Sequence, residues 1–377
     1  MAANNTMRAW VHKSTNLPLE KGMELVESHP RPLEPLNPDE ILVQVKCVGI
    51  NPADALFAEM GWPANAIIKQ TPLPGMDFSG VVVSTGNSVT SMHPGDRVFG
   101  RVDTQNSVPG AMAEFTKAEL EGCVLMPSGI EFEQAAGVGT AAITAYETLV
   151  LNCKPGDSVF INGGTGGVGT FAIQFARAHG CHVTVSCSTT KVKLCKELGA
   201  QDVIDYKTQD LAAVLKEKGR VFSLAVDYAY REGTNLYRAS NDFVKPGGKL
   251  IMIPGGFTGD TMKTIARSML CPSTLGGGRA KFEVYFARSN RAGFEQIAEW
   301  MAAGKVRTVI DTVYEFGNMP KAIEKIKLGT ATGKIINAAP EILTDVPTMN
   351  ISDYGNGTHL DFMDHSLFEM NGDFSFM

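Results

Sequence analysis

The chain has 377 residues, of which 44% are hydrophobic and 20% are charged. This composition is typical of a globular protein and argues against a disordered or fibrous chain. No apolar run reaches the roughly 18 residues that suggest a membrane-spanning helix, and residues 1–9 lack the basic and apolar regions of a secretory signal. The net charge of −6 gives no indication of nucleic-acid binding. We therefore expect a cytoplasmic protein with neither a membrane nor a nucleic acid as its partner.

The acidic charge is concentrated near the C-terminus. Residues 341–377 contain seven acidic side chains and no Lys or Arg, so the rest of the chain has a net charge of +1. The segment shows no hydrophobic periodicity, which predicts an acidic, mobile tail. A solvated end and a docking segment for a partner protein are both compatible with this composition.

The cysteines do not indicate a disulfide framework. Their number is odd, and no pair has the CxxC spacing of a redox or zinc motif. We expect reduced thiols, as in cytosolic proteins. The seven residues are Cys47, Cys123, Cys153, Cys181, Cys187, Cys195 and Cys271.

The first third of the chain is predicted to be rich in β-strands. Residues 41–48 alternate in polarity and are enriched in Val, as in a sheet edge or a barrel wall. Short apolar stretches at 81–83 and 97–99 are separated by glycines and prolines, and Pro94-Gly95-Asp96 predicts a turn. A compact β-rich unit is therefore predicted over roughly residues 1–125.

The pattern changes after residue 130. Residues 132–150 are apolar and rich in Ala, Thr and Gly, which predicts a buried helix. Predicted strands at 158–162, 182–186, 202–205, 222–227 and 249–254 then alternate with predicted helices at 168–179, 191–198 and 211–218. Such repeats predict a parallel sheet with helices on both faces. A last strand, helix and strand are predicted at 309–314, 319–327 and 334–337, as a short return to the first unit.

The strongest functional signal follows the first of these alternating strands. Residues 162–169, NGGTGGVG, contain the pattern GxGxxG. Glycines at this spacing allow a tight turn, a close approach of backbone to a pyrophosphate and close packing of helix on strand, and the helix N-terminus attracts phosphates. A glycine-rich connection without a ligand is the alternative, but the strand–turn–helix context favours a dinucleotide site. The predicted cofactor-binding residues are Gly164, Thr165, Gly166, Gly167, Val168 and Gly169.

The second strand bears on the choice between NAD and NADP. An NAD site usually places Asp or Glu near the end of this strand, where it binds the ribose 2′-hydroxyl. Here residues 186–191 read SCSTTK and contain no acid. Hydroxyls and a lysine suit a 2′-phosphate, although Ser188 and Lys191 fit a helix cap and a solvated first-turn residue equally well. The missing acid favours NADPH.

Several motifs occur in an order that resembles the zinc-independent branch of the medium-chain dehydrogenase/reductase superfamily, with its quinone oxidoreductases, zeta-crystallin relatives and enoyl reductases. They are Asn51-Pro52-x-Asp54, residues 74–80 (PGMDFSG), 94–98 (PGDRV), 110–115 (GAMAEF), 144–146 (TAY), 163–169 and the closing segment 331–335 (ATGKI). The resemblance implies an α/β protein. A GroES-like, β-rich catalytic domain would comprise residues 1–127 and 305–340, and a Rossmann domain with a doubly wound parallel sheet would comprise residues 128–304. The tail, residues 341–377, has no counterpart in the resemblance.

The same resemblance implies further contacts with the cofactor. It places Ser188, Lys191 and Tyr206 at the 2′-phosphate of NADPH. It places Ile253, Pro254 and Gly255 beside the nicotinamide, which their backbone would approach. It also implies a homodimer.

The zinc sites of related dehydrogenases are not expected in this chain. A catalytic zinc needs about three protein ligands, and the positions at which zinc-dependent relatives carry a Cys and a His are Asn51 and Met76. No cysteine lies between Gly95 and Glu121, where a structural zinc would need four. Metal-free chemistry is therefore predicted.

Without a Lewis acid, an α,β-unsaturated carbonyl or a quinone is the expected hydride acceptor, because hydrogen bonds can stabilise the oxygen that becomes negative. Asn51 is the candidate catalytic residue, since the resemblance places it near the nicotinamide and its amide can donate to an oxygen. Satisfying the turn before Pro52 is an equally good explanation for it. The Tyr that many members of the resembled family place after this motif is missing, so water or the substrate would supply the proton. Leu56, Phe57, Met60 and Trp62 are candidates for an apolar pocket, although packing in the core is the more common fate of such residues.

Three functions remain open on the sequence. The first is NADPH-dependent, metal-free hydride transfer to an α,β-unsaturated carbonyl or quinone, with an apolar small molecule as the substrate. The second is a trans-acting enoyl reductase, or another tailoring enzyme, that works with a carrier protein or synthase of a polyketide-type pathway. The third is an NADPH-binding protein without turnover, either crystallin-like or regulatory.

Overall fold

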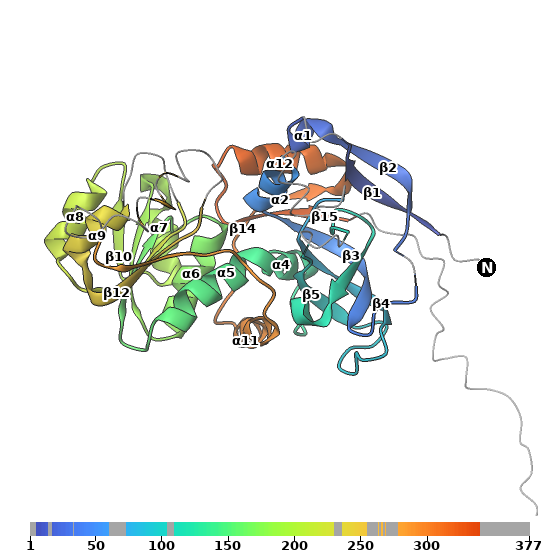
Figure 1. Cartoon of the computed structure of the whole chain (residues 1–377), viewed down its shortest axis with the longest axis horizontal. Helices are drawn as coiled ribbons and strands as arrows, with labels where there is room; N and C mark the ends of the chain where they lie inside the picture. The colour runs from blue at the N-terminus through green and yellow to red at the C-terminus, as the bar shows by residue number, and fades with distance from the viewer. Residues whose placement is uncertain are drawn as a thin grey trace, which may run out of the picture. The chain divides into compact units, whose positions relative to one another are not determined.

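The computed structural model describes residues 5–13, 17–32, 34–59, 73–103, 109–229, 236–254, 263, 265–266, 268 and 278–339. The chain divides into two units, Met1–Pro340 and Glu341–Met377, and every described residue belongs to the first. The predictions for Met60, Trp62, Gly255, Cys271 and the acidic tail lie outside the described residues. Figure 1 shows the described elements as two sheets, each accompanied by helices.

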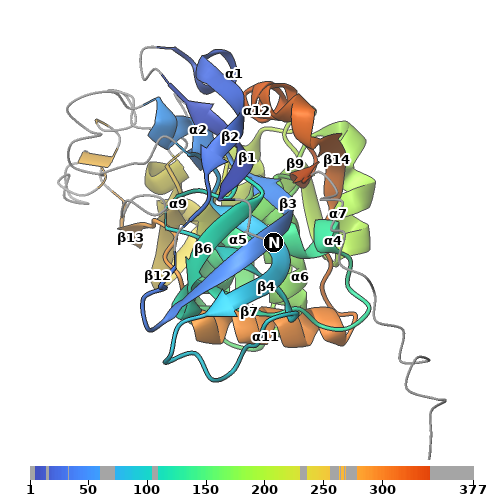
Figure 2. The ribbon, with the colours of Figure 1, turned by 90° about the vertical axis from the view of Figure 1, so that its right-hand side faces the viewer.

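The first sheet is mostly antiparallel. Its strands lie in the order β14-β15-β3-β4-β5-β7, and β6 also pairs with β3, so that β3 is flanked by β4 and β6 (Figure 2). The predicted strand at 41–48 lies within β3, where Ile41, Val43 and Val45 are buried. The strands are β3 (Glu40–Ile50), β4 (Asp77–Thr85), β5 (Arg97–Arg101), β6 (Phe115–Glu119), β7 (Cys123–Leu125), β14 (Ile310–Glu315) and β15 (Lys334–Ala338). A separate antiparallel pair, β1 (Thr6–His12) and β2 (Met23–Pro30), is connected through the short helix α1 (Leu19–Gly22).

The end of the described chain returns to this first sheet. Strand β15 pairs with β3, with Ile335 opposite Ile50, and β14 pairs with β15 in parallel. Helix α12 (Met319–Lys327) lies between them in sequence and buries Met319 and Ile323. The predicted strand–helix–strand at the end is therefore present, while the domain boundaries themselves stay a prediction.

The second sheet has six parallel strands in the order β10-β9-β8-β11-β12-β13. Its central strands are apolar, as expected for parallel strands buried on both faces; Val159, Phe160 and Ile161 have no exposed surface. The strands are β8 (Ser158–Asn162), β9 (His182–Cys187), β10 (Asp202–Asp205), β11 (Phe222–Asp227), β12 (Val244–Met252) and β13 (Lys281–Val284). The accompanying helices are α6 (Gly167–Ala178), α7 (Val192–Leu198), α8 (Leu211–Lys218), α9 (Leu236–Phe243) and α11 (Arg291–Ala302). The predicted α/β architecture is confirmed: a β-rich, mostly antiparallel sheet and a doubly wound parallel sheet.

This strand order fixes where a ligand can bind. Successive strands leave β8 in opposite directions, first toward β9 and β10 and then toward β11, β12 and β13. In open sheets of this kind, ligands bind outside the carboxyl ends of the strands at the point where the order reverses. That point is the end of β8, where the glycine-rich turn begins.

Three local predictions differ from the structure. The helix expected at 132–150 is divided into α4 (Phe132–Ala136) and α5 (Gly139–Leu149). Asp77 reaches the start of α5 because Gly139 has no side chain; a Cβ there would collide with the Asp77 carboxyl group. Strand β12 begins at Val244, earlier than the predicted residue 249. A helix, α2 (Pro52–Ala58), was not predicted, although Asn51 as its N-cap and Pro52 at its first position are typical start signals.

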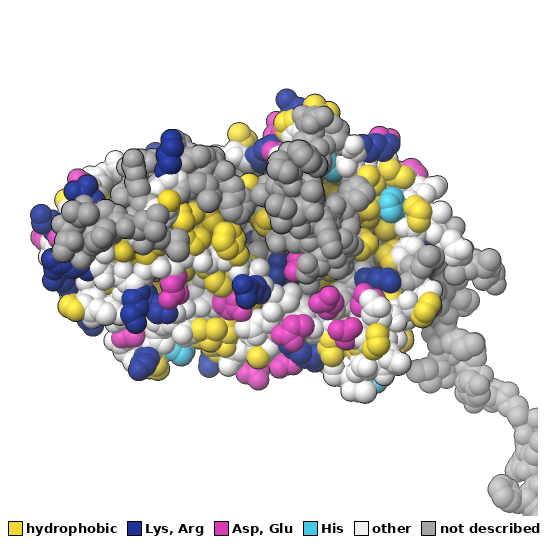
Figure 3. Space-filling view, viewed as in Figure 1, with side chains coloured by type: hydrophobic (Ala, Val, Ile, Leu, Met, Phe, Trp, Pro, Cys, Tyr) yellow, Lys and Arg dark blue, Asp and Glu magenta, His cyan; other side chains and the backbone are white. Residues whose placement is uncertain are grey.

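The described surface carries charges of both signs. On the face shown in Figure 3, Lys and Arg side chains are interspersed with Asp and Glu. A uniformly basic surface, which phosphate backbones attract, is not seen on the described part of this face. Among the helices of the described residues, none has both the length and the hydropathy that crossing a bilayer requires.

Helix α11 packs against the first sheet through an aromatic pair. Phe294 of α11 and Phe99 of β5 pack edge to face, with ring centroids 6.3 Å apart, and neither ring has exposed surface. We expect Phe294→Ala to lower the free energy of unfolding by about 3–5 kcal/mol, because it removes buried surface and leaves a cavity. Urea unfolding at equilibrium measures this change. Leu328→Ala is the control: its side chain is 70% exposed and should change stability by less than about 0.5 kcal/mol. A similar effect for both variants would contradict the prediction.

Candidate active site

The glycine-rich turn after β8 has the geometry of a dinucleotide-binding turn. Gly163 has φ +86°, a left-handed conformation that favours glycine. A Cβ on Gly164 would collide with Val185 of β9, and a Cβ on Gly169 would collide with the backbone of Gly163. Helix α6 can therefore approach the strands closely, and the N–H groups of its first turn lack partners within the helix. Such a helix start attracts a phosphate group.

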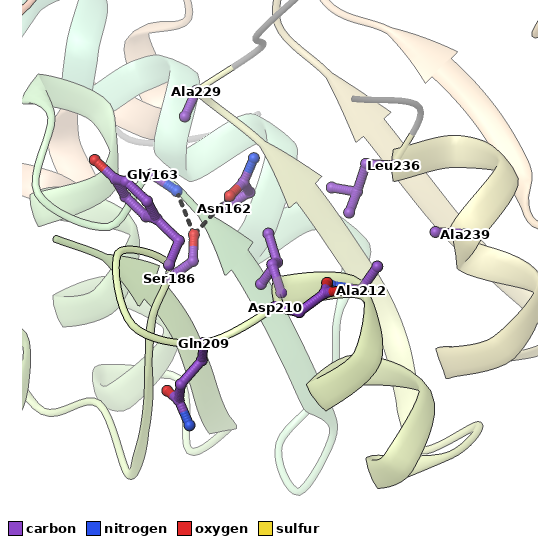
Figure 4. Close-up of a pocket in the computed structure, with 11 residues that line it drawn as sticks. Asn162, Gly163, Ser186, Gln209, Asp210, Ala212, Ala229, Leu236 and Ala239 are labelled. Atoms are coloured by element: carbon purple, nitrogen blue, oxygen red, sulfur yellow. Dashed lines mark hydrogen bonds between the residues drawn. The ribbon is translucent and has the colours of Figure 1, made fainter. Parts of the chain in front are cut away.

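A cavity of about 420 Å³ opens beside this turn. It lies at the carboxyl ends of β8, β9, β10 and β11, and residues of α8 and α9 complete its wall (Figure 4). Its lining consists of Asn162, Gly163, Ser186, Tyr206, Gln209, Asp210, Leu211, Ala212, Ala229, Leu236 and Ala239. The position is the reversal point of the sheet, and the volume lies in the range of small-molecule sites, roughly 300–1,000 Å³.

Hydrogen bonds fix the polar edge of this cavity. The Ser186 hydroxyl donates to Asn162 Oδ1 at 2.5 Å and accepts from the Gly163 N–H at 3.2 Å (Figure 4). Asn162 Nδ2 in turn donates to Asp227 Oδ1 at 2.8 Å. Burial raises the pKa of Asp227 despite this hydrogen bond. The network connects the ends of β8, β9 and β11 and holds the glycine-rich turn in place.

Of the three residues predicted to bind the 2′-phosphate, only Tyr206 lines this cavity. Tyr206 lines the cavity, and its N–H donates to the carbonyl oxygen of Cys187, next to Ser188. Ser188 and Lys191 do not line it; Lys191 Nζ donates to the carbonyl oxygens of Thr330 and Ala331, both at 3.4 Å. In the described structure Lys191 forms no ion pair with an acidic residue, so its charge is not neutralised there.

The neighbouring strand β10, which pairs with β9, does end in an acid. Asp205 ends β10, and a hydrogen bond from Thr189 lowers the pKa of its carboxyl group. Asp205 also accepts from the Lys207 N–H at 3.0 Å. It is absent from the cavity lining, so the end of β9 remains without a carboxylate directed at the cavity.

A second cavity, of about 250 Å³, joins the glycine-rich turn to the first sheet. Gly166, Gly167, Val168 and Gly169 line it together with Asn51 and residues of the closing segment, among them Ala331, Gly333 and Lys334. The Gly333 N–H donates to the Thr165 carbonyl oxygen at 2.9 Å. The sequence motifs at 51–54, 163–169 and 331–335 therefore meet at one place.

The Asn51 side chain is already fully engaged within the protein. Its Oδ1 accepts from Lys334 Nζ at 2.6 Å, and its Nδ2 donates to Asp77 Oδ2 at 2.8 Å and to the Gly49 carbonyl oxygen at 3.3 Å. The residue is 4% exposed. Both amide protons thus have protein acceptors, and a role in which Asn51 positions Lys334 and Asp77 fits better than direct donation to a substrate. Its catalytic assignment stays a prediction.

Asn51 belongs to a buried ionic cluster. Lys334 Nζ lies 3.2 Å from Asp77 Oδ2, with side chains 2% and 0% exposed. The other oxygen of Asp77 accepts from the N–H and the hydroxyl of Thr140, at 2.7 and 2.6 Å. Asp54 accepts from the N–H groups of Asn51 and Met76, and burial together with the neighbouring Asp77 raises the pKa of Asp54 to about 7.

A third cavity, of about 110 Å³, is mostly apolar. It brings the predicted pocket residues Leu56 and Phe57 together with Ile253 and Pro254, which the resemblance places at the nicotinamide. The sequence interpretation missed Arg101, Thr140 and Tyr285, which also line it. A charged residue at the end of an apolar strand was the available signal for Arg101.

Comparison with known proteins identifies the family of this chain. The model of the alcohol dehydrogenase GroES-like domain matches residues 37–129, and that of zinc-binding dehydrogenases matches residues 198–336. The trans-enoyl reductase pgmF of Aspergillus terreus is 40% identical over 358 residues, which cover 90% of this chain and 98% of that protein. The mitochondrial NAD(P)H oxidoreductase RTN4IP1 of Danio rerio is 30% identical over 329 residues, 79% of this chain and 83% of that protein. The solved quinone oxidoreductase from Coxiella burnetii has a TM-score of 0.74 at 25% identity and covers 89% of this chain and 99% of its own.

Together, the GroES-like sheet, the parallel sheet with its glycine-rich turn and these similarities define the protein as an oxidoreductase. The chain belongs to the medium-chain dehydrogenase/reductase superfamily, whose members use a nicotinamide cofactor.

The described residues do not fit the zinc ion in the name of one matching family model. They contain no group of three or more His, Cys, Asp or Glu side chains that could hold a metal. Asn51 and Met76 stand where zinc-dependent relatives carry their ligands. Asn51 Oδ1 accepts from the Lys334 ammonium, and the Met76 thioether lies 3.8 Å from the Arg101 guanidinium. Cationic side chains thus lie beside both positions, where they would repel a metal ion.

The buried ion pair should be essential for stability. Lys334→Met leaves the Asp77 carboxylate buried without its cation, which typically lowers the free energy of unfolding by about 3–5 kcal/mol. Lys13→Met is the matched control, because the Lys13–Glu24 pair is exposed and should contribute less than about 1 kcal/mol. Urea unfolding compares the two variants, and a loss below about 1 kcal/mol in Lys334→Met would contradict the assignment.

The titration of Asp54 should be visible in the pH dependence of stability. With a pKa of about 7, the folded state holds this proton more tightly than the unfolded chain, in which an Asp has a pKa of about 3.9. The resulting stabilisation is complete below about pH 4 and is lost as the pH rises through about 7. Asp54→Asn lacks this titration, so wild type should lose stability relative to the variant across that range. Unfolding free energies measured at several pH values test this, and parallel curves would refute it.

Proposed function

We propose that this oxidoreductase reduces the carbon–carbon double bond of an α,β-unsaturated carbonyl compound with NADPH and without a metal, as an enoyl reductase that acts in trans. The observation that carries the proposal is the third cavity. There, apolar side chains from α2 meet Ile253 and Pro254 at the end of β12, and no zinc-ligand set lies among the described residues around it. An apolar cavity of this kind suits a substrate whose reacting carbon accepts a hydride.

The preference for NADPH rests on the end of β9. No acid of β9 faces the first cavity, whereas Tyr206 does, and Lys191 beyond the strand has no acidic partner among the described residues. A 2′-phosphate needs positive charge and hydrogen-bond donors. The Ser188 hydroxyl and the Lys191 ammonium would supply them, with Tyr206 beside the ribose.

The residues of the chain would bind and orient the cofactor in three places. The start of α6 would hold the pyrophosphate, and Ser186 and Asn162 would border the adenosine half. The Ile253 N–H donates to the Asp227 carbonyl oxygen at 3.0 Å, which fixes the backbone beside the predicted nicotinamide position. A bound nicotinamide would supply the hydride, and the protein would contribute its orientation.

Similarity supports the trans-acting interpretation. The chain shares 40% identity with pgmF, named a trans-enoyl reductase, over 98% of that protein. An enzyme of this kind would act on an acyl chain carried by a separate carrier protein or synthase. The similarity to a quinone oxidoreductase, at 25% identity, makes free quinones the acceptors to compare.

A screen of acceptors tests the reaction. Purified full-length protein is mixed with NADPH and with an enoyl thioester on a carrier protein, the same acyl group on a small thiol, a simple enone or a quinone. NADPH oxidation that is fastest with the carrier-bound enoyl group is expected. Oxidation with quinones alone would contradict the trans-enoyl assignment, and NADPH binding without oxidation by any acceptor would favour a protein without turnover.

The cofactor preference is tested at Lys191. Lys191→Ala should raise the KM for NADPH about tenfold, since a charge-assisted hydrogen bond contributes roughly 1.5–3 kcal/mol and an exposed one contributes at the low end. The KM for NADH and kcat should change little, because the lost interaction concerns binding. Lys193→Ala is the matched control, two residues further along and exposed beside Glu197. Equal losses for NADPH and NADH would remove the 2′-phosphate argument.

A further inference from the structure

A buried arginine lines the third cavity without an acidic partner. Arg101, the last residue of β5, is 3% exposed. One terminal nitrogen donates to the Ala287 carbonyl oxygen at 3.4 Å, and the other lies 3.8 Å from Met76 Sδ. In the described structure its Nε has no hydrogen-bond partner, and no carboxylate of a described residue forms an ion pair with the guanidinium.

The expected partner of Arg101 is engaged elsewhere. Asp77 lies directly opposite Arg101 in the β4–β5 ladder, and opposite charges at such positions usually pair. The Asp77 carboxylate is instead bound by Lys334, Asn51 and Thr140. A guanidinium has five donors, so a carbonyl and a thioether leave it largely unsatisfied. Buried charges without partners are unfavourable, and each such case in a native structure calls for an explanation.

The other acid near the cavity is also engaged. The Glu147 carboxylate accepts from the Tyr285 hydroxyl and from Asn290 Nδ2, the latter at 2.7 Å. Burial and the hydrogen bond to Glu147 raise the pKa of Tyr285, so this hydroxyl stays protonated and directed at Glu147. The nearby carboxylates of Asp54, Asp77 and Glu147 are therefore bound by other described groups and not by Arg101.

We propose that Arg101 binds the carbonyl oxygen of the substrate and neutralises its charge when that oxygen becomes an enolate. The proposal rests on the proposed function and extends it with a specific residue. The β-carbon of the substrate accepts a hydride, the electron pair of the C=C bond forms the enolate double bond, and the carbonyl electron pair moves onto oxygen beside Arg101. The enolate then takes a proton from water at its α-carbon, and the nicotinamide that gave the hydride is left oxidised.

This role explains why the guanidinium lies in this particular cavity. Ile253 and Pro254, predicted to face the nicotinamide, line the same cavity as Arg101 and the apolar residues Leu56 and Phe57. A fixed cation at the place where negative charge develops stabilises the transition state strongly, because it needs no reorganisation during the reaction. Compounds with an isolated double bond have no such oxygen and should not be reduced.

Anion binding tests the proposal without turnover. Calorimetry on full-length protein with NADPH present measures the affinity for hexanoate, whose carboxylate mimics the enolate oxygen, and for the neutral hexanamide. Wild type should prefer hexanoate by at least tenfold, and Arg101→Gln should bind both within twofold. Arg97→Gln is the matched control on the same strand, since Arg97 lies over the Phe132 ring and donates to the Ile130 carbonyl oxygen; it should keep the preference.

Two results would overturn the role of Arg101. One is a wild type without preference for hexanoate, and the other is an Arg101→Gln variant that keeps the preference. If Arg101→Gln does not fold, as judged by circular dichroism, Arg101→Lys decides: it should bind hexanoate about tenfold more weakly than wild type, and unchanged affinity would refute the proposal. Failure of wild type to oxidise NADPH with any enoyl acceptor would instead refute the proposed function and leave the hexanoate preference intact.

Kinetics provide a second readout. Arg101→Gln should lower kcat with an enoyl substrate roughly 100-fold or more, as expected for the loss of one donor to a developing oxyanion, while the KM for NADPH stays unchanged. Guanidinium ion added to Arg101→Ala should restore part of the rate, which a merely structural arginine would not allow. Absence of both effects would argue against contact between Arg101 and the substrate.

Discussion

The buried ion pair between Lys334 and Asp77 is the interaction on which the rest of the site depends. The two residues are 257 positions apart, and their side chains have almost no exposed surface, so each charge must be satisfied within the protein. Lys334 also donates to Asn51 and to the Ile50 carbonyl oxygen, and Asp77 accepts from the start of α5. This cluster therefore connects β15, the end of β3, β4 and helix α5.

The residue before Lys334 holds the glycine-rich turn against the first sheet. Gly333, next to Lys334, has φ +80°, and its N–H donates to Thr165 within the glycine-rich turn. Because Gly333 adopts a left-handed conformation, Gly333 contacts the glycine-rich turn while Lys334, the next residue, contacts the buried cluster. Two adjacent residues thus connect the glycine-rich turn to the ionic cluster.

Much of the fold could be predicted from the sequence, because its signals are local. Alternating apolar strands and helices, the GxGxxG spacing and the turn at Pro94-Gly95-Asp96 each lie within a short window. The cavities could be predicted only in part. That Leu56 and Phe57 share a cavity with Ile253 follows from contacts between distant segments, for which only the family resemblance gave a guide. The pairing of Asp77 with Lys334, the saturation of Asn51 and the isolation of Arg101 depend on packing at long sequence separation, and no spacing in the chain indicates them.

Under the role proposed for Arg101, the distribution of charge in this core accounts for hydride transfer without zinc. In this core, the two acids Asp54 and Asp77 lie beside one cation, Lys334. Arg101 is a second cation in the described core, and no carboxylate accepts from its donors. Arg101 stands on a strand hydrogen-bonded on both sides, to β4 and β7, and a site on such an element is held more accurately than one on a loop. In the proposed reaction, the residues of α2 and of the strand ends would shape the cavity for the acyl group, while the strand would fix the position of the carbonyl oxygen. In the proposed reaction, the guanidinium of Arg101 would replace the electrophilic contribution of a metal.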